Sequence, residues 1–133
     1  MSYSSNPPSS RLGRDLANQR QALGQQGEEV VVHLLKKRGW IILAQNWRSR
    51  HGELDIVAQK EQQVLFIEVK TRTSAQFQLS QVITPSKQRK IAITARQFMA
   101  EHNMHSLANV YRFDVALVQQ DQLVSYIPNA FTL

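Results

Sequence analysis

Two neighbouring strand-like segments, residues 52–57 and 64–70, constrain the fold of this chain more than any other feature. Only a short polar link separates them, which predicts an antiparallel hairpin. Because side chains alternate along a strand, Glu68 and Lys70 point the same way, while Asp55 stands alone among apolar neighbours. Buried charges are costly unless they are paired or bind a metal. The hairpin therefore predicts a functional site as well as a sheet.

Helix-capping and helix-ending residues indicate where the other elements begin and end. Gly39 follows three cations and ends a first helix, and Thr84-Pro85 is typical of a helix N-cap followed by the first helical residue. The order α-β-β-β-α-β-β predicts an α/β fold with a mixed central β-sheet flanked by helices. In chain order we expect a helix at about 24–38, strands at about 40–46, 53–59 and 63–72, a helix at about 84–102, and strands at about 109–118 and 122–127.

Domain organisation is simple. Residues 1–22 are rich in Ser, Asn, Gln and Arg, so we expect a flexible basic tail that lacks fixed structure in isolation. Residues 23–133 are expected to form a single α/β domain, which suits a chain of 133 residues.

Composition narrows the classes of function. The chain has no cysteine, which excludes a disulfide framework, a thiolate metal site and a cysteine nucleophile. No apolar run approaches the roughly 20 residues needed to cross a membrane, so we expect a cytoplasmic protein with no membrane association. The formal net charge of +6 is compatible with a polyanionic partner such as nucleic acid.

The first helix carries two adjacent glutamates that periodicity separates. Val31 and Leu35 belong to an apolar stripe, and Glu28 falls at its edge, whereas Glu29 falls on the far side. We therefore expect Glu28 to face the core and Glu29 to face water.

Carboxylates from this helix and from the hairpin would suit a divalent cation. Mg²⁺ prefers oxygen ligands, which Asp55, Glu68 and Glu28 would supply, and Mn²⁺ is the alternative ion. A bound dication would acidify a water molecule and offset charge on a phosphate. Lys70 would then orient or deprotonate the water, or stabilise the transition state. The interpretation that follows is phosphodiester hydrolysis with Glu28, Asp55, Glu68 and Lys70 as catalytic residues.

The pattern resembles the PD-(D/E)xK nuclease superfamily, and more closely the YraN-type small bacterial proteins related to archaeal Holliday-junction resolvases. Leu54 stands at the "P" of the superfamily motif. The resemblance implies a restriction-endonuclease-like core, a Mg²⁺- or Mn²⁺-dependent endonuclease acting on branched or structured DNA, and a homodimer; RNA remains an alternative substrate. The residues that carry the resemblance are Gly24-x-x-Gly27-Glu28, Asn46-x-Arg48, Gly52-Glu53-Leu54-Asp55, Phe66-x-Glu68-Val69-Lys70-Thr71-Arg72, Lys87 and Arg112-Phe113-Asp114.

Each of these residues also has a simpler interpretation. Glu68 and Lys70 would form an ion pair on a solvated sheet face, Asp55 would end a strand, and Glu28 would be an ordinary helix residue. Glu53 shares the face of Asp55, but a structural role is at least as well supported, and we expect Asp114 to be structural. Basic residues that flank the proposed site are candidates for phosphate contacts: Arg48, Arg50, Arg72, Lys87, Arg89 and Lys90.

Two other functions compete with the endonuclease. One is a nucleic-acid-binding module that keeps the fold without catalysis. The other is a protein-interaction role in which residues 1–22 and the apolar segment 127–131 serve as docking elements. Charged residues within apolar strands favour the endonuclease, because a docking surface does not require them.

Overall fold

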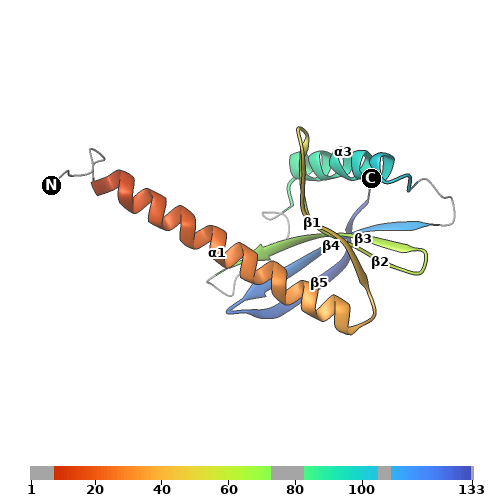
Figure 1. Cartoon of the computed structure of the whole chain (residues 1–133), viewed down its shortest axis with the longest axis horizontal. Coiled ribbons are helices and arrows are strands. Elements are labelled where there is room, and N and C mark those ends of the chain that lie inside the picture. Colours follow the sequence, from red (N-terminus) through yellow and green to blue (C-terminus); the bar gives the residue numbers. More distant parts are fainter. Residues whose placement is uncertain (1–7, 73–82, 105–108, 133) are drawn as a thin grey trace.

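A five-stranded sheet with one helix on each face forms the protein, as described by a computed structural model for residues 8–72, 83–104 and 109–132 (Figure 1). The predicted α/β class and the element order α-β-β-β-α-β-β are confirmed. The elements are α1 (Pro8–Lys37), β1 (Ile41–Ser49), β2 (Gly52–Lys60), β3 (Gln63–Thr71), α3 (Pro85–Glu101), β4 (Val110–Gln119) and β5 (Gln122–Phe131).

The sheet is mixed, and its strands follow the spatial order β1-β2-β3-β4-β5. β1, β2 and β3 are joined by tight turns and pair antiparallel, as do β4 and β5. β3 and β4 pair parallel, which requires a crossover connection, and α3 provides it. Thr84 caps α3 by accepting a hydrogen bond from the Lys87 amide, as Thr84-Pro85 predicts.

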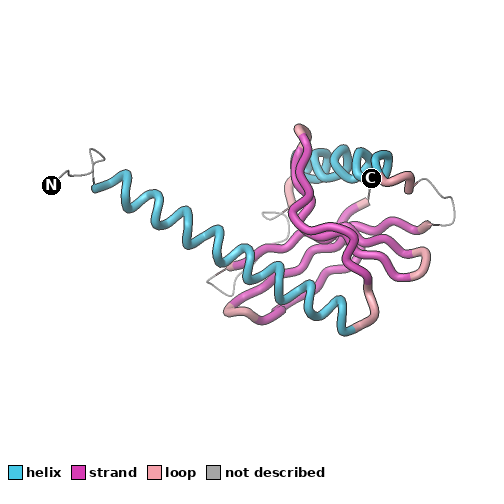
Figure 2. Tube along the Cα trace, in the orientation of Figure 1, coloured by secondary structure: helices cyan, strands magenta, loops and turns pink. Residues whose placement is uncertain are grey.

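Alternation along β3 divides the core into two layers. Phe66 packs on one side of the sheet with Phe98 of α3, and Ile67 packs on the other side with Val31 of α1. Figure 2 shows α1 crossing one face of the strands and α3 lying over the other. Each helix therefore approaches the β2–β3 hairpin from its own side.

The chain end belongs to this core. β5 extends to Phe131, which is buried and stacks on Phe113 at 4.9 Å between ring centroids. The prediction of a strand ending near residue 127 is therefore too short. Phe131 is not available as a docking element, since its aromatic surface is already covered.

The first helix is longer than predicted, because it begins at Pro8 rather than near residue 24. Residues 8–22, which were expected to belong to a flexible tail, are helical here, and residues 1–7 lie outside the described part. That the tail lacks fixed structure in isolation stays a prediction. Arg, Leu, Ala and Gln in this segment favour the helix, and no proline interrupts it after its first residue. We call residues 8–23 the arm, because they project away from the sheet (Figure 1). Neither described helix combines the length and the apolar character needed to cross a membrane.

Candidate metal centre

Asp55 lies where β2 and β3 separate. The pairing of these strands ends at Ile56 and Ile67, although β3 continues to pair with β4 on its other side. The Asp55 carboxylate fills the gap, since its Oδ2 accepts a hydrogen bond from the Val69 amide at 2.9 Å. The fork therefore orients Asp55, and Glu68 is the corresponding first residue of β3 beyond the ladder.

Three carboxylates from two elements meet at this fork. Glu28 of α1 and Glu53 and Asp55 of β2 each place one oxygen within 4.8 Å of the others. Glu68 is outside this triad, but its charge acts on both Asp55 and Glu28. The structure thus brings together Glu28 and Asp55, as predicted, adds Glu53, and places Glu68 beside them.

Glu28 reaches the fork because α1 packs closely on the sheet at Gly27. A Cβ atom at Gly27 would lie 2.2 Å from Thr71 Oγ1, so a larger residue would have to displace the Thr71 hydroxyl, which glycine avoids. Glu28 is half-buried and Glu29 exposed, which confirms the prediction from periodicity. From β1, Asn46 hydrogen-bonds the Glu28 side chain, and its left-handed backbone (φ 51°) is opposite Asp55.

Burial and mutual repulsion disfavour the ionised forms of these carboxyls. Burial, followed by the charge of Glu68, raises the pKa of Asp55 to about 8 from 3.8. Burial also raises the pKa of Glu28, although its hydrogen bond to Asn46 opposes the increase. Apolar side chains such as Phe66 and Ile91 share with Asp55 and Glu68 the lining of a cavity of only about 10 Å³, which leaves little room for hydrating water.

Two cations partly offset the acidic charge. Lys70 Nζ lies 3.2 Å from Glu68 Oε1, and Arg48 Nε lies 3.2 Å from Glu53 Oε2. The ion pair that the simpler interpretation expected is therefore present, but its side chains are only 22% and 17% exposed, so it does not lie on a solvated face. When all four carboxylates are ionised, two negative charges remain uncompensated.

A divalent cation fits this group in charge and chemistry. Mg²⁺–oxygen distances of about 2.0–2.1 Å allow two ligands to be at most about 4.2 Å apart. Only opposite ligands of an octahedral shell reach that separation, and adjacent ligands are about 3 Å apart, so pairs of triad oxygens, which lie within 4.8 Å of one another, would have to approach by up to about 2 Å to share one ion. Glu28, Glu53 and Asp55 could therefore hold such an ion, with Glu68 next to these three ligands.

The predicted phosphate-contacting residues are all exposed. Arg48 is already paired with Glu53, and Arg50 Nε contacts His51 Nε2 at 3.4 Å. Gly52 packs against Thr94 of α3, which brings the β1–β2 turn beside that helix. Arg72 follows β3 directly. Nucleic-acid contact stays a prediction for the whole set, Arg48, Arg50, Arg72, Lys87, Arg89 and Lys90.

Asp114 has the structural role expected of it. The side chain is buried, and it accepts hydrogen bonds from Arg112 Nε and Nη2, from the Asn129 amide, each at 2.9 Å, and from the Tyr126 hydroxyl. These bonds connect β4 to β5. The pKa of Tyr126 is raised, mainly by burial and next by the hydrogen bond to Asp114. Asp114 is thus fully engaged and is not free to bind a ligand.

Sequence reasoning gave too little weight to Glu53 and Asn46. Alternation along the strand places Glu53 and Asp55 on one face, but this alone does not show whether Glu53 is a metal ligand or a surface carboxylate. Asn46 gave a second signal, since it stands in the Asn46-x-Arg48 pattern. Only the fold shows that both residues meet Glu28.

Comparison with known proteins places the chain in a family. A family model described as "Uncharacterised protein family UPF0102" matches residues 27–118. A UPF0102 protein of Trichlorobacter lovleyi is 41% identical over 119 residues, which cover 85% of this chain and 92% of that protein. UPF0102 proteins of Synechococcus sp. and Desulfosudis oleivorans are each 38% identical, covering 85% and 87% of this chain and 93% and 94% of their own lengths. The chain therefore belongs to UPF0102, the YraN family.

Proposed function

We propose that this protein is a Mg²⁺- or Mn²⁺-dependent endonuclease that hydrolyses phosphodiester bonds in DNA. The convergence of Glu28, Glu53 and Asp55 at the β2–β3 fork, with Lys70 next to Glu68, carries the proposal. Once its carboxylates are ionised, an acidic group that lacks two positive charges attracts a dication, and an adjacent amine suits chemistry on a phosphate.

The residues of the chain would divide the work. Asp55, oriented by the Val69 amide, and Glu28 and Glu53 would hold the ion. When bound, the ion would supply an acidified water and offset charge on the scissile phosphate. Lys70, positioned by Glu68, would orient the attacking water or donate a hydrogen bond to the phosphate.

DNA as the substrate is supported by charge outside the acidic centre. The formal net charge is +6, and exposed cations occupy the β1–β2 turn, the end of β3 and α3. Each cation that contacts a phosphate would release counterions and steepen the salt dependence of binding. The resemblance to junction resolvases makes branched DNA the first substrate to test.

Cleavage assays test the proposal directly. The protein is incubated with labelled junction, flap, duplex and single-stranded DNA, with Mg²⁺ or Mn²⁺ and with EDTA. We expect metal-dependent cutting that is lost in Asp55→Ala and Lys70→Ala and kept in Glu101→Ala and Lys60→Ala, which remove the same kinds of charge from exposed sites.

Two outcomes contradict the endonuclease. Cutting that survives Asp55→Ala or Lys70→Ala would point to a contaminating nuclease. Salt-dependent binding of DNA with no cutting in either metal would instead support the non-catalytic nucleic-acid-binding module.

A further inference from the structure

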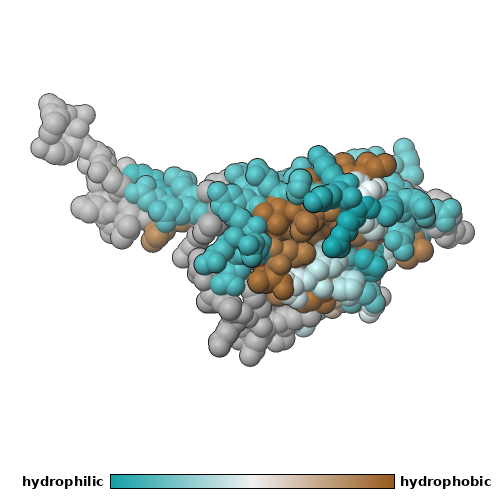
Figure 3. Space-filling model, turned by 90° about the horizontal axis from the view of Figure 1, so that it is seen from below, coloured by the Kyte–Doolittle hydropathy of each residue, from teal (hydrophilic) through white to brown (hydrophobic). Residues whose placement is uncertain are grey.

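An apolar stripe runs along α1 from the arm into the folded domain. With about 3.6 residues per turn, Leu12 and Val30 lie about five turns apart, as do Leu16 and Leu34, so these four positions share one face of the helix. The Leu16 side chain is 45% exposed. Figure 3 shows a small apolar spot on the arm and a larger apolar patch on the domain.

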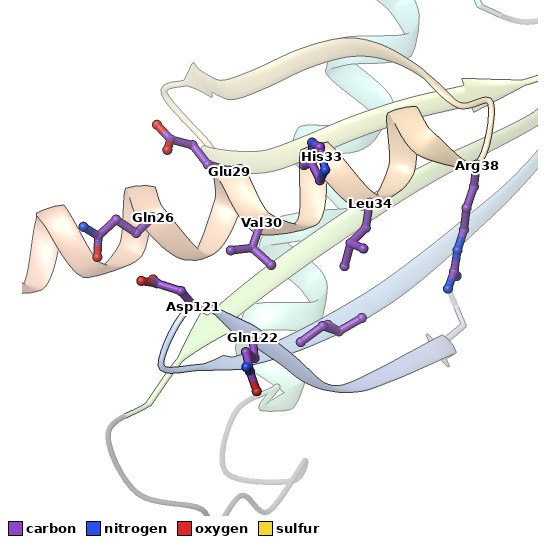
Figure 4. Close-up of a pocket in the computed structure, with 9 residues that line it drawn as sticks. Gln26, Glu29, Val30, His33, Leu34, Arg38, Asp121 and Gln122 are labelled. Carbon is purple, nitrogen blue, oxygen red and sulfur yellow. The ribbon is translucent and has the colours of Figure 1, made fainter.

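At its domain end the stripe forms one wall of a groove between α1 and β5. Val30 and Leu34 face Leu123 across a space of about 790 Å³. Figure 4 shows Glu29 and Asp121 at one end of this groove and Arg38 at the other. This space lies apart from the acidic centre, because none of its lining residues belongs to the fork.

An arm of this kind needs a partner. Most helical stability in proteins comes from packing of an apolar face rather than from intrinsic propensity. The arm projects beyond the sheet, so the domain does not supply that packing for Leu16. The same chain offers an apolar groove on the same helix face.

We propose that two copies of this chain pair through α1 in antiparallel orientation, so that the arm of each copy occupies the α1–β5 groove of the other. A pair centred on residue 23 places Leu16 of one copy beside Val30 of its partner, because both are seven residues from the centre. The contact is self-complementary, as a two-fold dimer requires, and it spans about 33 Å from residue 12 to residue 34.

Charge favours a second copy over nucleic acid as the occupant. The arm carries Arg11, Arg14 and Arg20 against Asp15, an excess of two positive charges. The groove lining carries Glu29 and Asp121 against Arg38, a net negative charge that would attract this arm and repel a phosphate backbone. The pairing does not depend on the proposed nuclease activity, and its test measures mass rather than cleavage.

Sedimentation of the full chain over a range of concentrations is the first test. We expect a dimer whose dissociation constant rises by about tenfold or more in Leu16→Glu. Asn18→Glu adds the same charge at an exposed position about 200° around the helix and should leave the dimer intact. Circular dichroism checks that both variants stay folded. We expect that they do, because Leu16 is exposed. A wild-type monomer at all concentrations, or a dimer indifferent to Leu16→Glu, would overturn the proposal.

A cross-link tests the register. The chain has no cysteine, so Leu16→Cys with Val30→Cys introduces the only two thiols. These positions are about 21 Å apart within one helix, far beyond disulfide reach, so oxidation joins them only between copies. We expect a covalent dimer from this variant and little from Asn18→Cys with Val30→Cys. Equal cross-linking in both variants, or none in the first, would exclude the antiparallel register.

Discussion

Replacing Asp55 with asparagine should stabilise the metal-free protein at alkaline pH. Burial and the charge of Glu68 raise the pKa of Asp55 to about 8 from 3.8. A carboxyl whose pKa is higher in the folded state binds its proton more tightly there. Folding is therefore favoured below about pH 4, and this contribution is lost as the pH rises towards about 8. Asparagine keeps an oxygen for the Val69 amide and has no charge to bury.

The magnitude follows from the size of the shift. Roughly three pKa units are crossed between about pH 5 and about pH 8, which at about 1.4 kcal/mol per unit sets a ceiling of about 4 kcal/mol. The charges of neighbouring carboxylates change with pH as well, and solvent reaches the half-buried fork, so we expect about 2 kcal/mol, or about 7 °C in Tm for a chain of this size.

Thermal and urea unfolding in EDTA at these two pH values measure the effect. The wild type should lose about 2 kcal/mol more than Asp55→Asn between about pH 5 and about pH 8. The comparison cancels the groups that titrate in both proteins. Added Mg²⁺ or Mn²⁺ should stabilise the wild type by about 2.7 kcal/mol at a concentration 100 times the Kd, and Asp55→Asn much less. Equal pH dependence in the two proteins, or equal stabilisation by metal, would refute the reasoning.

Substitutions at two other sites test whether metal binding depends on the close packing of α1 on the sheet or on the stability of the fold in general. Gly27→Ala should destabilise the fold by about 1–3 kcal/mol and weaken metal binding, because the new Cβ meets Thr71 Oγ1 at 2.2 Å. A Cβ atom at Gly24 meets nothing within 4 Å, so Gly24→Ala should increase the free energy of unfolding by about 0.5–1 kcal/mol through helix propensity. Equal stabilities of the two variants in urea unfolding would contradict this account. Asp114→Ala should lower the free energy of unfolding by about 3–5 kcal/mol, since it leaves Arg112 and Tyr126 without their shared hydrogen-bond partner. Metal affinity, measured by titration below the Tm of the variant, should stay unchanged. Metal affinity that falls in Asp114→Ala while the fold persists would show that Asp114 serves the acidic centre.

The acidic centre and the α1 pairing use different faces of one helix. Glu28 faces the fork, whereas Val30 and Leu34 line the groove against β5. Because helix faces two residues apart point about 200° apart, one segment serves both surfaces. The proposed dimer would therefore carry two acidic centres, one in each copy.

Local patterns in the sequence determined the type and order of the elements. Alternation in residues 64–70 defined β3, and Thr84-Pro85 marked the start of α3, because backbone geometry fixes the period of each element and the chemistry of a cap. Periodicity also separated Glu28 from Glu29, since the direction of a side chain from a helix depends only on its position along the chain.

Tertiary structure decided which of these residues meet. Glu53 joins Glu28 and Asp55 because β2 leaves β3 at a fork and Gly27 lets α1 approach, and neither event follows from local pattern. The few apolar residues of the arm suggested a flexible tail, whereas α1 is a continuous helix from Pro8. The sequence by itself thus specified elements and faces. Strand register and helix approach, which depend on contacts between distant residues, specified the acidic centre.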